Sequence, residues 1–340
     1  MLDQSVRRIK RPYLLFLGDA DPELGAKTAQ GIAYWRPELC IGQLSLPDCA
    51  VSVGLEEINL AEAVARGAKS LVIGVASHGG IIAPSWIPTL CEALRNGLDI
   101  VNGLHERTSD NAVLAKIAEE HGRQLHDVRH TDFPIPVASG KKRSGKRLLT
   151  VGTDCAVGKM YTTLALHRAM NGAGKKTHLC TTGQTGIMIA GFGIAIDAVV
   201  ADFISGAAEL LAPSIPPDEW QVIEGQGSLF HPSFAGVTLG LVHGAQPDAM
   251  ILCHNPSRTG MNGAIHFPLP ELDICIAAYE TAARLTNPSA KVIGVSLNTN
   301  DMTDEESLRL IDQTSNSLGL PCADPVRTGI DVFLPHIAKI

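Results

Sequence analysis

Residues 152–160, with the sequence GTDCAVGKM, are of the types that bind phosphate groups. Backbone N–H groups of a glycine-containing loop can point at an anion, and the dipole of the following helix favours negative charge there. Lys159 is placed to reach a terminal phosphate. The loop follows an apolar run and opens an amphipathic stretch, which is the context that such a motif requires. We predict a phosphate site formed by Gly152, Thr153, Asp154, Cys155, Ala156, Val157, Gly158, Lys159 and Met160.

Met160 stands where a magnesium-dependent nucleotide hydrolase carries Ser or Thr. Hard cations do not accept a thioether sulfur in place of that hydroxyl, so the usual Mg²⁺ contact is lost. Thr162 and Thr163 follow within the next half turn, where geometry disfavours a substitute ligand. The residues therefore predict a phosphate site without metal-assisted phosphoryl transfer. The alternative is a glycine-rich turn that only caps a helix.

Other reactive side chains follow apolar runs that are typical of strands. Glu224 ends the run WQVIE, and His254 and Arg258 come after the run AMILC. Ligands bind at the carboxyl ends of parallel strands, so these positions are candidates for chemistry. We predict catalytic roles among Glu224, His231, His254 and Asp154, and we predict that Arg258 binds a substrate carboxylate. For His231 and His254 the alternative is a structural role, and for Arg258 it is a surface ion pair.

The composition describes a compact folded protein. Of 340 residues, 45% are hydrophobic and 19% are charged, which excludes a disordered chain. The formal net charge of -7 leaves no basic surplus for a phosphate backbone, so we expect no nucleic-acid partner. We interpret the basic cluster KKRSGKR at 141–147 as a solvated linker rather than a binding patch.

The cysteine pattern indicates a reducing compartment. The chain has 8 cysteines, no CxxC pair, and several cysteines inside apolar runs, so we expect neither disulfides nor a metal site. No apolar run reaches the ~18 residues that span a bilayer. We therefore expect a cytoplasmic protein without a membrane partner. We also expect a homo-oligomer, a dimer or higher, because the apolar segment 233–245 could be a helix at a dimer interface; an ordinary core helix is the alternative.

Two α/β domains are needed to position these groups. In the first half, the apolar runs at 13–19, 70–75 and 99–104 predict buried parallel strands that alternate with amphipathic helices. The alternation predicts right-handed crossovers and a doubly wound sheet. It restarts after a segment rich in Pro, Gly, Ser and Lys, with a helix at 158–172 and strand-like runs that include 195–202. We predict an N-terminal Rossmann-like domain at 1–135, a linker at 136–146 and a P-loop domain with a mainly parallel sheet at 147–340.

The first domain shows no dinucleotide fingerprint. The segment FLGDADPELGAKTAQG at 16–31 lacks the GxGxxG pattern, which disfavours an NAD site, although Lys27 and Thr28 could bind an anion at a helix N-terminus. The segment GVASHGGIIAPSW at 74–86 also follows a strand. Its glycines would allow a ligand to approach closely, and His78 would lie at the same edge. It is a second candidate site.

The loop GTDCAVGKM resembles the GTDTxVGKT loop of dethiobiotin synthetase, which uses ATP and Mg²⁺. In that comparison Glu224, in EGQG, resembles a carboxylate that faces the metal, and Asn298 stands where the family contacts adenine. The chain as a whole resembles the D-glutamate N-acetyltransferase family. The resemblance rests on GTDCAVGKM, TTGQTGIMIAGFG, DAVVADFISGAAE, EGQGSLFHPSFAG and GAKTAQGIAYWRP, and it covers nearly all residues.

That family resemblance implies transfer of an acetyl group from acetyl-CoA to the amino group of a small acidic amino acid. Such a reaction uses a phosphate cradle for CoA and has no obligatory Mg²⁺. Gln184, inside the second of these segments, is then expected to bind substrate. Two alternatives remain open at this point: an ATP-dependent ligase or kinase of the dethiobiotin synthetase kind, and a nucleotide-binding regulatory protein without turnover.

Overall fold

The structure, a computed structural model, describes residues 9–22, 25–75, 77–131 and 133–340. It divides into two compact units. We call the described part of Asp3–Asp132, together with Gln184–Ala195, the N-terminal unit, and Phe133–Gly183 with Ile196–Ile340 the C-terminal unit. Both sheets are parallel throughout, which confirms the predicted α/β class.

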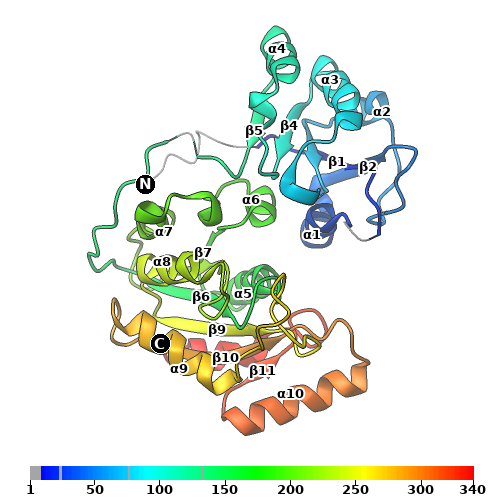
Figure 1. The fold of residues 1–340 in the computed structure, drawn as a ribbon. Helices are drawn as coiled ribbons and strands as arrows, with labels where there is room; N and C mark the ends of the chain where they lie inside the picture. Colours follow the sequence, from blue (N-terminus) through cyan, green and yellow to red (C-terminus); the bar gives the residue numbers. More distant parts are fainter. Residues whose placement is uncertain (1–8, 23–24, 76, 132) are drawn as a thin grey trace. The chain divides into compact units, whose positions relative to one another are not determined.

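The sheet of the N-terminal unit has the strand order β2-β1-β3-β4-β5 (Figure 1). Strand β1 lies inside the sheet, between β2 and β3, and is buried along its whole length, as expected for a strand of a parallel sheet that is covered on both faces. Leu14 of β1 pairs with Leu71 of β3. The strands are β1 (Tyr13–Gly18), β2 (Cys40–Ser45), β3 (Ser70–Ile73), β4 (Asp99–Asn102) and β5 (Leu125–Asp127).

The helices of the N-terminal unit follow the predicted alternation. Two of them begin at asparagine N-caps: the Asn59 side chain accepts from Glu62 N, and the Asn111 side chain accepts from Val113 N and Leu114 N. The α-helices are α1 (Lys27–Trp35), α2 (Leu60–Ala65), α3 (Ile87–Arg95), α4 (Ala112–Glu120) and α6 (Gln184–Ala190), and the 3-10 turns are η1 (Pro37–Leu39), η2 (His78–Gly80), η3 (Pro84–Trp86) and η4 (Thr108–Asp110).

Helix α6 belongs to the N-terminal unit although it lies far along the sequence. The carbonyl of Met188 accepts a hydrogen bond from the Tyr13 hydroxyl, and the carbonyl of Ile189 accepts from the guanidinium groups of Arg11 and Arg36. These bonds satisfy carbonyls at the end of a short helix. The domains predicted from the sequence are continuous. In the structure, residues 184–195 belong to the N-terminal unit, although the residues on either side of them belong to the C-terminal unit.

The sheet of the C-terminal unit has the strand order β11-β10-β9-β6-β8-β7. Strand β6 carries the phosphate loop and lies between β8 and β9, so that Leu149 pairs with Ile223 on one side and Met250 on the other. The strands are β6 (Lys146–Gly152), β7 (Thr177–Cys180), β8 (Trp220–Ile223), β9 (Ala249–His254), β10 (Lys291–Leu297) and β11 (Cys322–Ala323).

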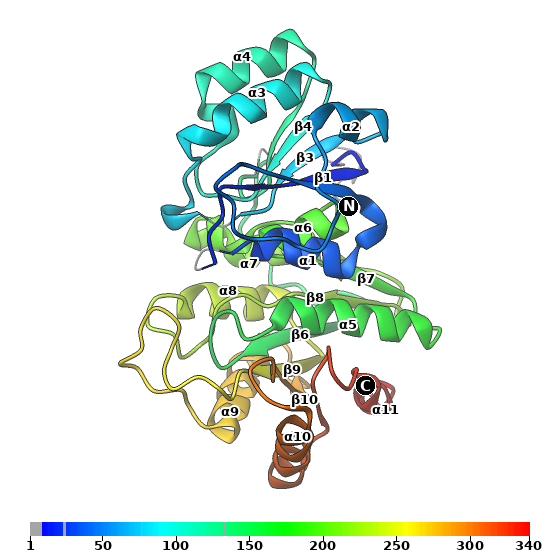
Figure 2. The same cartoon turned by 90° about the vertical axis from the view of Figure 1, so that its right-hand side faces the viewer.

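Helix α5 (Lys159–Gly172) packs against β6, β7 and β8 and can be followed beside them in Figure 2. Helix α8 packs against α7 and α9. Helix α10 begins with a capping box between Thr303 and Glu306. The remaining elements are α7 (Ile204–Leu211), α8 (Ala235–Ala245), α9 (Leu272–Arg284), α10 (Asp304–Leu318), α11 (Leu334–Ile337), η5 (Ile196–Ala198), η6 (Ala201–Phe203) and η7 (Asp331–Phe333).

The prediction that the basic cluster at 141–147 is a solvated linker is partly wrong. Lys141 and Lys142 are exposed, but Arg147 is buried and donates to the carbonyl of Gln246. Arg143 donates to the carbonyls of Ala212 and Ala245. These guanidinium groups satisfy backbone carbonyls inside the C-terminal unit, which the local composition could not reveal.

The segment 195–202, expected as a strand, forms the 3-10 turns η5 and η6. Ile196 is buried, whereas Val200 is 69% exposed and Asp197 and Asp202 face solvent. The segment therefore lacks the two buried faces that a strand inside a parallel sheet needs. Among the described helices of the whole chain, each is too short or too polar to cross a membrane.

Candidate functional site

The phosphate loop has the predicted local structure, with β6 ending at Gly152 and α5 beginning at Lys159. A Cβ atom at position 152 would lie 2.9 Å from Cγ2 of Val157 and 3.1 Å from Nζ of Lys159. Glycine therefore leaves room for the folded loop and for the ammonium group. The loop itself is tightly wound, because Ala156 has a φ of 50°, in the region that favours glycine.

The ammonium group of Lys159 lies inside this loop. Its Nζ donates a 2.8 Å hydrogen bond to the carbonyl of Asp154. Burial lowers the pKa of Lys159, because the charged form loses water without gaining a direct carboxylate partner in the described structure. An incoming phosphate would supply the missing counter-charge at the start of α5.

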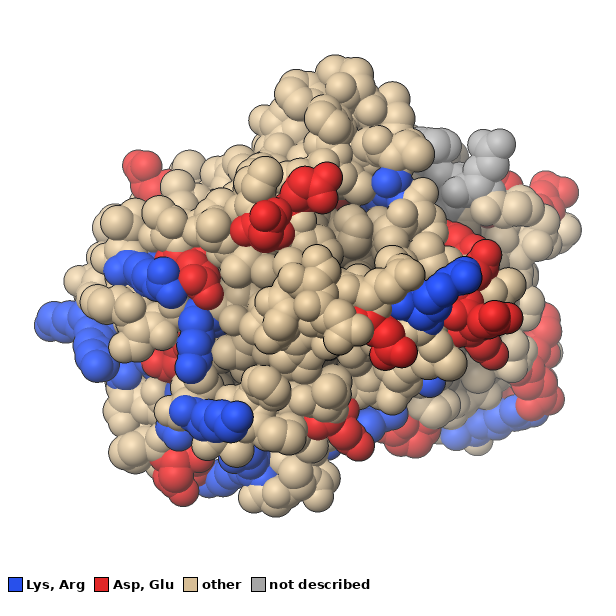
Figure 3. Space-filling model, turned by 90° about the horizontal axis from the view of Figure 1, so that it is seen from below, with Lys and Arg blue, Asp and Glu red and all other residues tan. Residues whose placement is uncertain are grey.

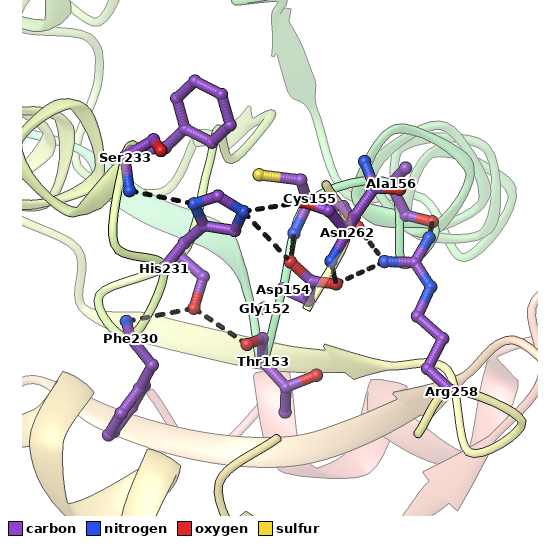
Figure 4. Close-up of polar contacts among 12 residues, drawn as sticks. Gly152, Thr153, Asp154, Cys155, Ala156, Phe230, His231, Ser233, Arg258 and Asn262 are labelled. Atoms are coloured by element: carbon purple, nitrogen blue, oxygen red, sulfur yellow. Dashed lines mark hydrogen bonds and ion pairs between the residues drawn. The ribbon is translucent and has the colours of Figure 1, made fainter. Parts of the chain in front are cut away.

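Asp154 anchors the phosphate loop to the segment after β9 (Figure 4). Its Oδ1 accepts from the N–H of Cys155 at 2.6 Å, and its Oδ2 accepts from the N–H of Asn262 at 2.8 Å and from the guanidinium of Arg258. The side chain is fully buried. Both oxygens are thus occupied, so the geometry gives the predicted catalytic role of Asp154 no support and favours a structural one.

Arg258 spans the phosphate loop. Besides its ion pair with Asp154, it donates to the carbonyl of Cys155 at 2.6 Å and to that of Ala156 at 3.0 Å. Its planar guanidinium suits this arrangement, because several N–H groups point in fixed directions. The predicted contact of Arg258 with a substrate carboxylate stays a prediction, and these bonds favour a role in fixing the loop.

Replacing Arg258 with Leu is expected to cost roughly 3 kcal/mol of stability, because it leaves the buried carboxylate of Asp154 without its cation. The loss should shift the thermal midpoint downwards and weaken binding of phosphate ligands. If Arg258 fixes the loop, the KM values for an acidic amino acid and for its neutral side-chain amide should change by the same factor. A rise in KM confined to the acidic amino acid would instead assign Arg258 to the substrate carboxylate.

His231 has the contacts of a structural histidine. Its Nδ1 accepts a 3.1 Å hydrogen bond from the N–H of Ser233, so the proton of the neutral ring is on Nε2, which donates to the carbonyl of Asn262 at 2.9 Å. The ring also stacks on Phe234, with 4.6 Å between centroids. The catalytic prediction for His231 gains nothing from this geometry.

Asp154, Cys155 and His231 place three possible metal-ligand atoms within 4.8 Å of one another. The nitrogen of His231 that lies nearer to Asp154 is Nε2, at 4.0 Å. That nitrogen carries the proton, and a protonated nitrogen cannot coordinate a metal. Arg258 already neutralises the carboxylate as well. These contacts do not fit a metal ion.

His254 ends β9 beside the loop. Its Nδ1 lies 2.9 Å from the hydroxyl of Thr153, and no described residue lies within hydrogen-bonding distance of its Nε2. Burial, and to a lesser degree the charge of Arg258, lowers the pKa of His254 to about 4. The ring is therefore neutral at physiological pH and can offer Nε2 to a ligand.

Glu224 directly follows β8 and is 4% exposed. Its Oε2 accepts from the N–H of Thr182 at 3.0 Å and from that of Gly183 at 3.3 Å. Burial outweighs these bonds and the charge of Lys159, and it raises the pKa of Glu224 to about 7. A carboxyl group with this pKa can exchange a proton near neutral pH.

Gly225 brings this carboxyl group close to the phosphate strand. A Cβ atom at position 225 would lie 1.8 Å from the carbonyl oxygen of Thr150, and the N–H of Gly225 donates to the Thr150 hydroxyl at 3.0 Å. Such a Cβ would also lie 3.1 Å from Cδ of Lys159. Glu224 and Lys159 therefore occupy one edge of the sheet, as predicted.

Asn298 lies beside the loop, as its position after β10 predicts. Its N–H donates to the carbonyl of His254 at 2.8 Å, and its Cβ is 3.7 Å from the place that a Cβ at Gly158 would take. Whether its side chain binds a cofactor stays a prediction.

The hydroxyl groups of Thr162 and Thr163, which follow Met160, already form hydrogen bonds with other groups. Thr162 bonds to the carbonyl of Gly158 and to the Ser296 hydroxyl, and Thr163 bonds to the carbonyl of Lys159 and the Thr150 hydroxyl. Both threonines are almost fully buried. Neither can replace the missing metal ligand without giving up these bonds.

Gln184 begins α6 and belongs to the N-terminal unit, so the C-terminal unit by itself does not bring it to the loop. The side chain of His78 lies outside the described residues.

Sequence reasoning missed Tyr279 of α9, whose buried hydroxyl donates to the carbonyl of Gly152 at 2.7 Å and accepts from the N–H of Leu229. The available signal was a tyrosine, the one aromatic residue of the helical segment LDICIAAYETAAR.

Comparisons with known proteins match both units. The models of two domains of unknown function match, DUF1611_N, a Rossmann-like domain, over 47–131, and DUF1611_C, a P-loop domain, over 136–334. A protein from Pseudoalteromonas sp named D-glutamate N-acetyltransferase is 47% identical over 330 residues, 97% of this chain and 99% of that protein. One of the same name from Tritonibacter scottomollicae is 48% identical, covering 98% and 100%. The crystal structure of a DUF1611 family protein from Anabaena variabilis superimposes with a TM-score of 0.86 at 32% identity, covering 97% of this chain and all of that one.

Proposed function

This chain belongs to the DUF1611 family, and we propose that it transfers the acetyl group of acetyl-CoA to the amino group of D-glutamate. Two proteins named D-glutamate N-acetyltransferase share nearly half of their residues with it over almost the full length. The family predicted from the sequence motifs is thereby confirmed, and the chain is an enzyme of the acyltransferase class.

One structural observation carries the proposal: a phosphate loop without a hydroxyl ligand for Mg²⁺ lies beside a carboxyl group with a pKa of about 7. The loop and Lys159 can hold a phosphate group of CoA, which is bound but not transferred. Glu224 supplies what acyl transfer needs in addition, a base whose pKa is near the operating pH.

The reaction requires a neutral amine next to a thioester. We assign Glu224 to accept a proton from the α-ammonium group of the amino acid. The amine then attacks the thioester carbonyl carbon, the C–N bond forms, and negative charge develops on the carbonyl oxygen. The C–S bond breaks as this intermediate collapses, and CoA leaves as a thiolate. The attacking nitrogen gives up its second proton to become the amide, and this proton converts the thiolate to the thiol of CoA.

His254 suits the stabilisation of that oxygen. If the Thr153 hydroxyl donates to Nδ1, the proton of the neutral ring is on Nε2, which faces no described partner. A neutral ring can donate this hydrogen bond without adding a positive charge to the edge of the sheet that also carries Glu224. This assignment makes Glu224 and His254 the two catalytic side chains of the proposal, and leaves Asp154 and His231 as structural residues.

The rival activity is ATP-dependent ligation or phosphorylation of the dethiobiotin synthetase kind. The sequence GTDCAVGK and the positions of Glu224 and Asn298 support it. Met160 and the committed hydroxyl groups of Thr162 and Thr163 oppose it, because Mg²⁺ at the phosphates would lack its usual protein ligand. A purely regulatory role does not fit a chain that belongs with named enzymes.

Chelation of divalent ions with EDTA is expected to leave acetyl transfer unchanged, because no proposed step uses a metal at the phosphates. Met160→Thr should then change kcat little, while adding a hydroxyl group that can bind Mg²⁺ near bound phosphates. The measurement is thiol release with and without EDTA. If EDTA abolishes activity and added Mg²⁺ restores it, the interpretation that Met160 marks a loop without a metal ion is wrong.

We further place the protein in the cytoplasm as a homo-oligomer. All 8 cysteines are free thiols, and five of them are buried, which suits a reducing compartment. Acidic side chains lie among the basic ones over the face shown in Figure 3, and the chain carries a formal net charge of -7. The oligomeric state stays a prediction.

A further inference from the structure

The N-terminal unit has a cavity of its own at the carboxyl edge of its sheet. The cavity has a volume of about 410 Å³, within the range of small-molecule sites. Side chains and backbone from several parts of the unit line it: Thr28 of α1, Val75 after β3, Gly103 and His105 after β4, Arg129 after β5, and Gln184 of α6.

The position of this cavity follows from the strand order. The chain passes from β1 outwards to β2 and then returns to β3 on the other side of β1. The order of the strands therefore reverses between β1 and β3, which is where open parallel sheets bind their ligands. Val75 follows β3 by two residues, and Thr28 lies in the helix that follows β1, so the cavity lies at this reversal.

The charges around the cavity suit an anion. Among the described residues that line it, none is acidic, whereas Arg129 brings a positive charge. The Nε of Arg129 donates to the carbonyl of Gly103 at 2.7 Å, which holds the guanidinium at the cavity wall. A planar guanidinium recognises carboxylates with paired hydrogen bonds.

The remaining polar groups suit a small polar molecule rather than a nucleotide. Thr28 is buried, and its hydroxyl accepts from that of Thr185. A Cβ at Gly103 would lie 3.0 Å from Cβ and Cγ of Gln184, so glycine leaves room for the Gln184 side chain, which lines the cavity at the end of β4. The turn after β1 lacks the glycine pattern that a dinucleotide requires.

We propose that this cavity binds the carboxylate of the acidic amino acid, with Arg129 as its cationic partner and Gln184 as a second polar contact. The inference rests on the proposed function in one respect, the choice of D-glutamate as the ligand. It gives the N-terminal unit a task in substrate binding.

The test is calorimetric titration of the full-length protein with D-glutamate, and in parallel with acetyl-CoA. Arg129→Gln should weaken D-glutamate binding by about 10- to 100-fold and leave acetyl-CoA affinity unchanged. Arg129→Lys should recover part of the loss, because it keeps the charge without the planar fork. Arg95→Gln, at an exposed arginine of α3 outside the cavity, is the matched control and should bind as the wild type does.

A variant that does not fold would be recognised by its melting curve, and Gln184→Met, which removes an amide from another wall of the cavity, then carries the test. D-glutamate binding that these variants leave unchanged would overturn the inference, even if acetyl transfer proceeds. Arg129-dependent binding of D-glutamate without acetyl transfer would sustain the inference and contradict the proposed function instead.

Discussion

Glu224→Gln should lower kcat for acetyl transfer by about 10²- to 10⁴-fold, the range that a positioned general base contributes. The fold should survive, because the glutamine carbonyl can still accept hydrogen bonds from the N–H groups of Thr182 and Gly183. Glu219→Gln is the matched control. It changes a glutamate directly before β8, at the opposite end of the same strand, where it pairs with Lys176.

The pH dependence gives this prediction a second readout. The base must be deprotonated, so wild-type kcat should rise as the pH passes through about 7, and the variant should lose that rise. The free energy of unfolding should fall over the same pH range in which kcat rises. The pKa of Glu224 is raised above its ordinary value, so the folded state binds this proton more tightly, and the stabilisation is lost as the pH rises through about 7. An unchanged kcat profile in the variant would remove Glu224 from the mechanism.

Lys159→Ala should weaken acetyl-CoA binding on the order of 10- to 150-fold, which corresponds to one lost charge-assisted hydrogen bond. Lys159→Met should do the same while keeping the bulk of the buried stem. Neither change should destabilise the apo protein strongly, because burial already disfavours the charge. The measurement is calorimetric titration with acetyl-CoA and with CoA.

The control for this change is Lys291→Ala, an exposed lysine at the amino end of β10, whereas the loop lies at the carboxyl edge of the sheet. It removes the same charge from the same unit and should leave affinity unaltered. Equal affinities of the wild type and both Lys159 variants for every CoA ligand would show that the loop does not bind phosphate.

The phosphate loop could be predicted because its features are local. A strand, a glycine-containing turn, Lys159 and an amphipathic helix follow one another directly in the sequence, and each constrains the next. Glu224 could be predicted for a similar reason, since an acid between a strand and a glycine lies at the ligand edge of a parallel sheet.

The contact between Asp154 and Arg258 could not be predicted, because it joins residues that are 104 positions apart in the sequence. From the sequence, each is an isolated reactive group, and only the fold shows that they neutralise each other. The same holds for α6, whose Met188 carbonyl bonds to Tyr13 across 175 residues. Local composition also described Arg147 as solvated, although its guanidinium donates to the carbonyl of Gln246 and pairs with Asp248, which only tertiary structure brings near.

Product analysis tests the central claim most directly. The purified protein is incubated with acetyl-CoA and D-glutamate in EDTA, and separately with Mg-ATP and D-glutamate, while free thiol, phosphate and the mass of the product are followed. We predict equal amounts of thiol and N-acetyl-D-glutamate in the first reaction, and no phosphate release that depends on D-glutamate in the second. Phosphate release that depends on D-glutamate, without any N-acetyl-D-glutamate, would contradict the account and favour the ATP-dependent alternative.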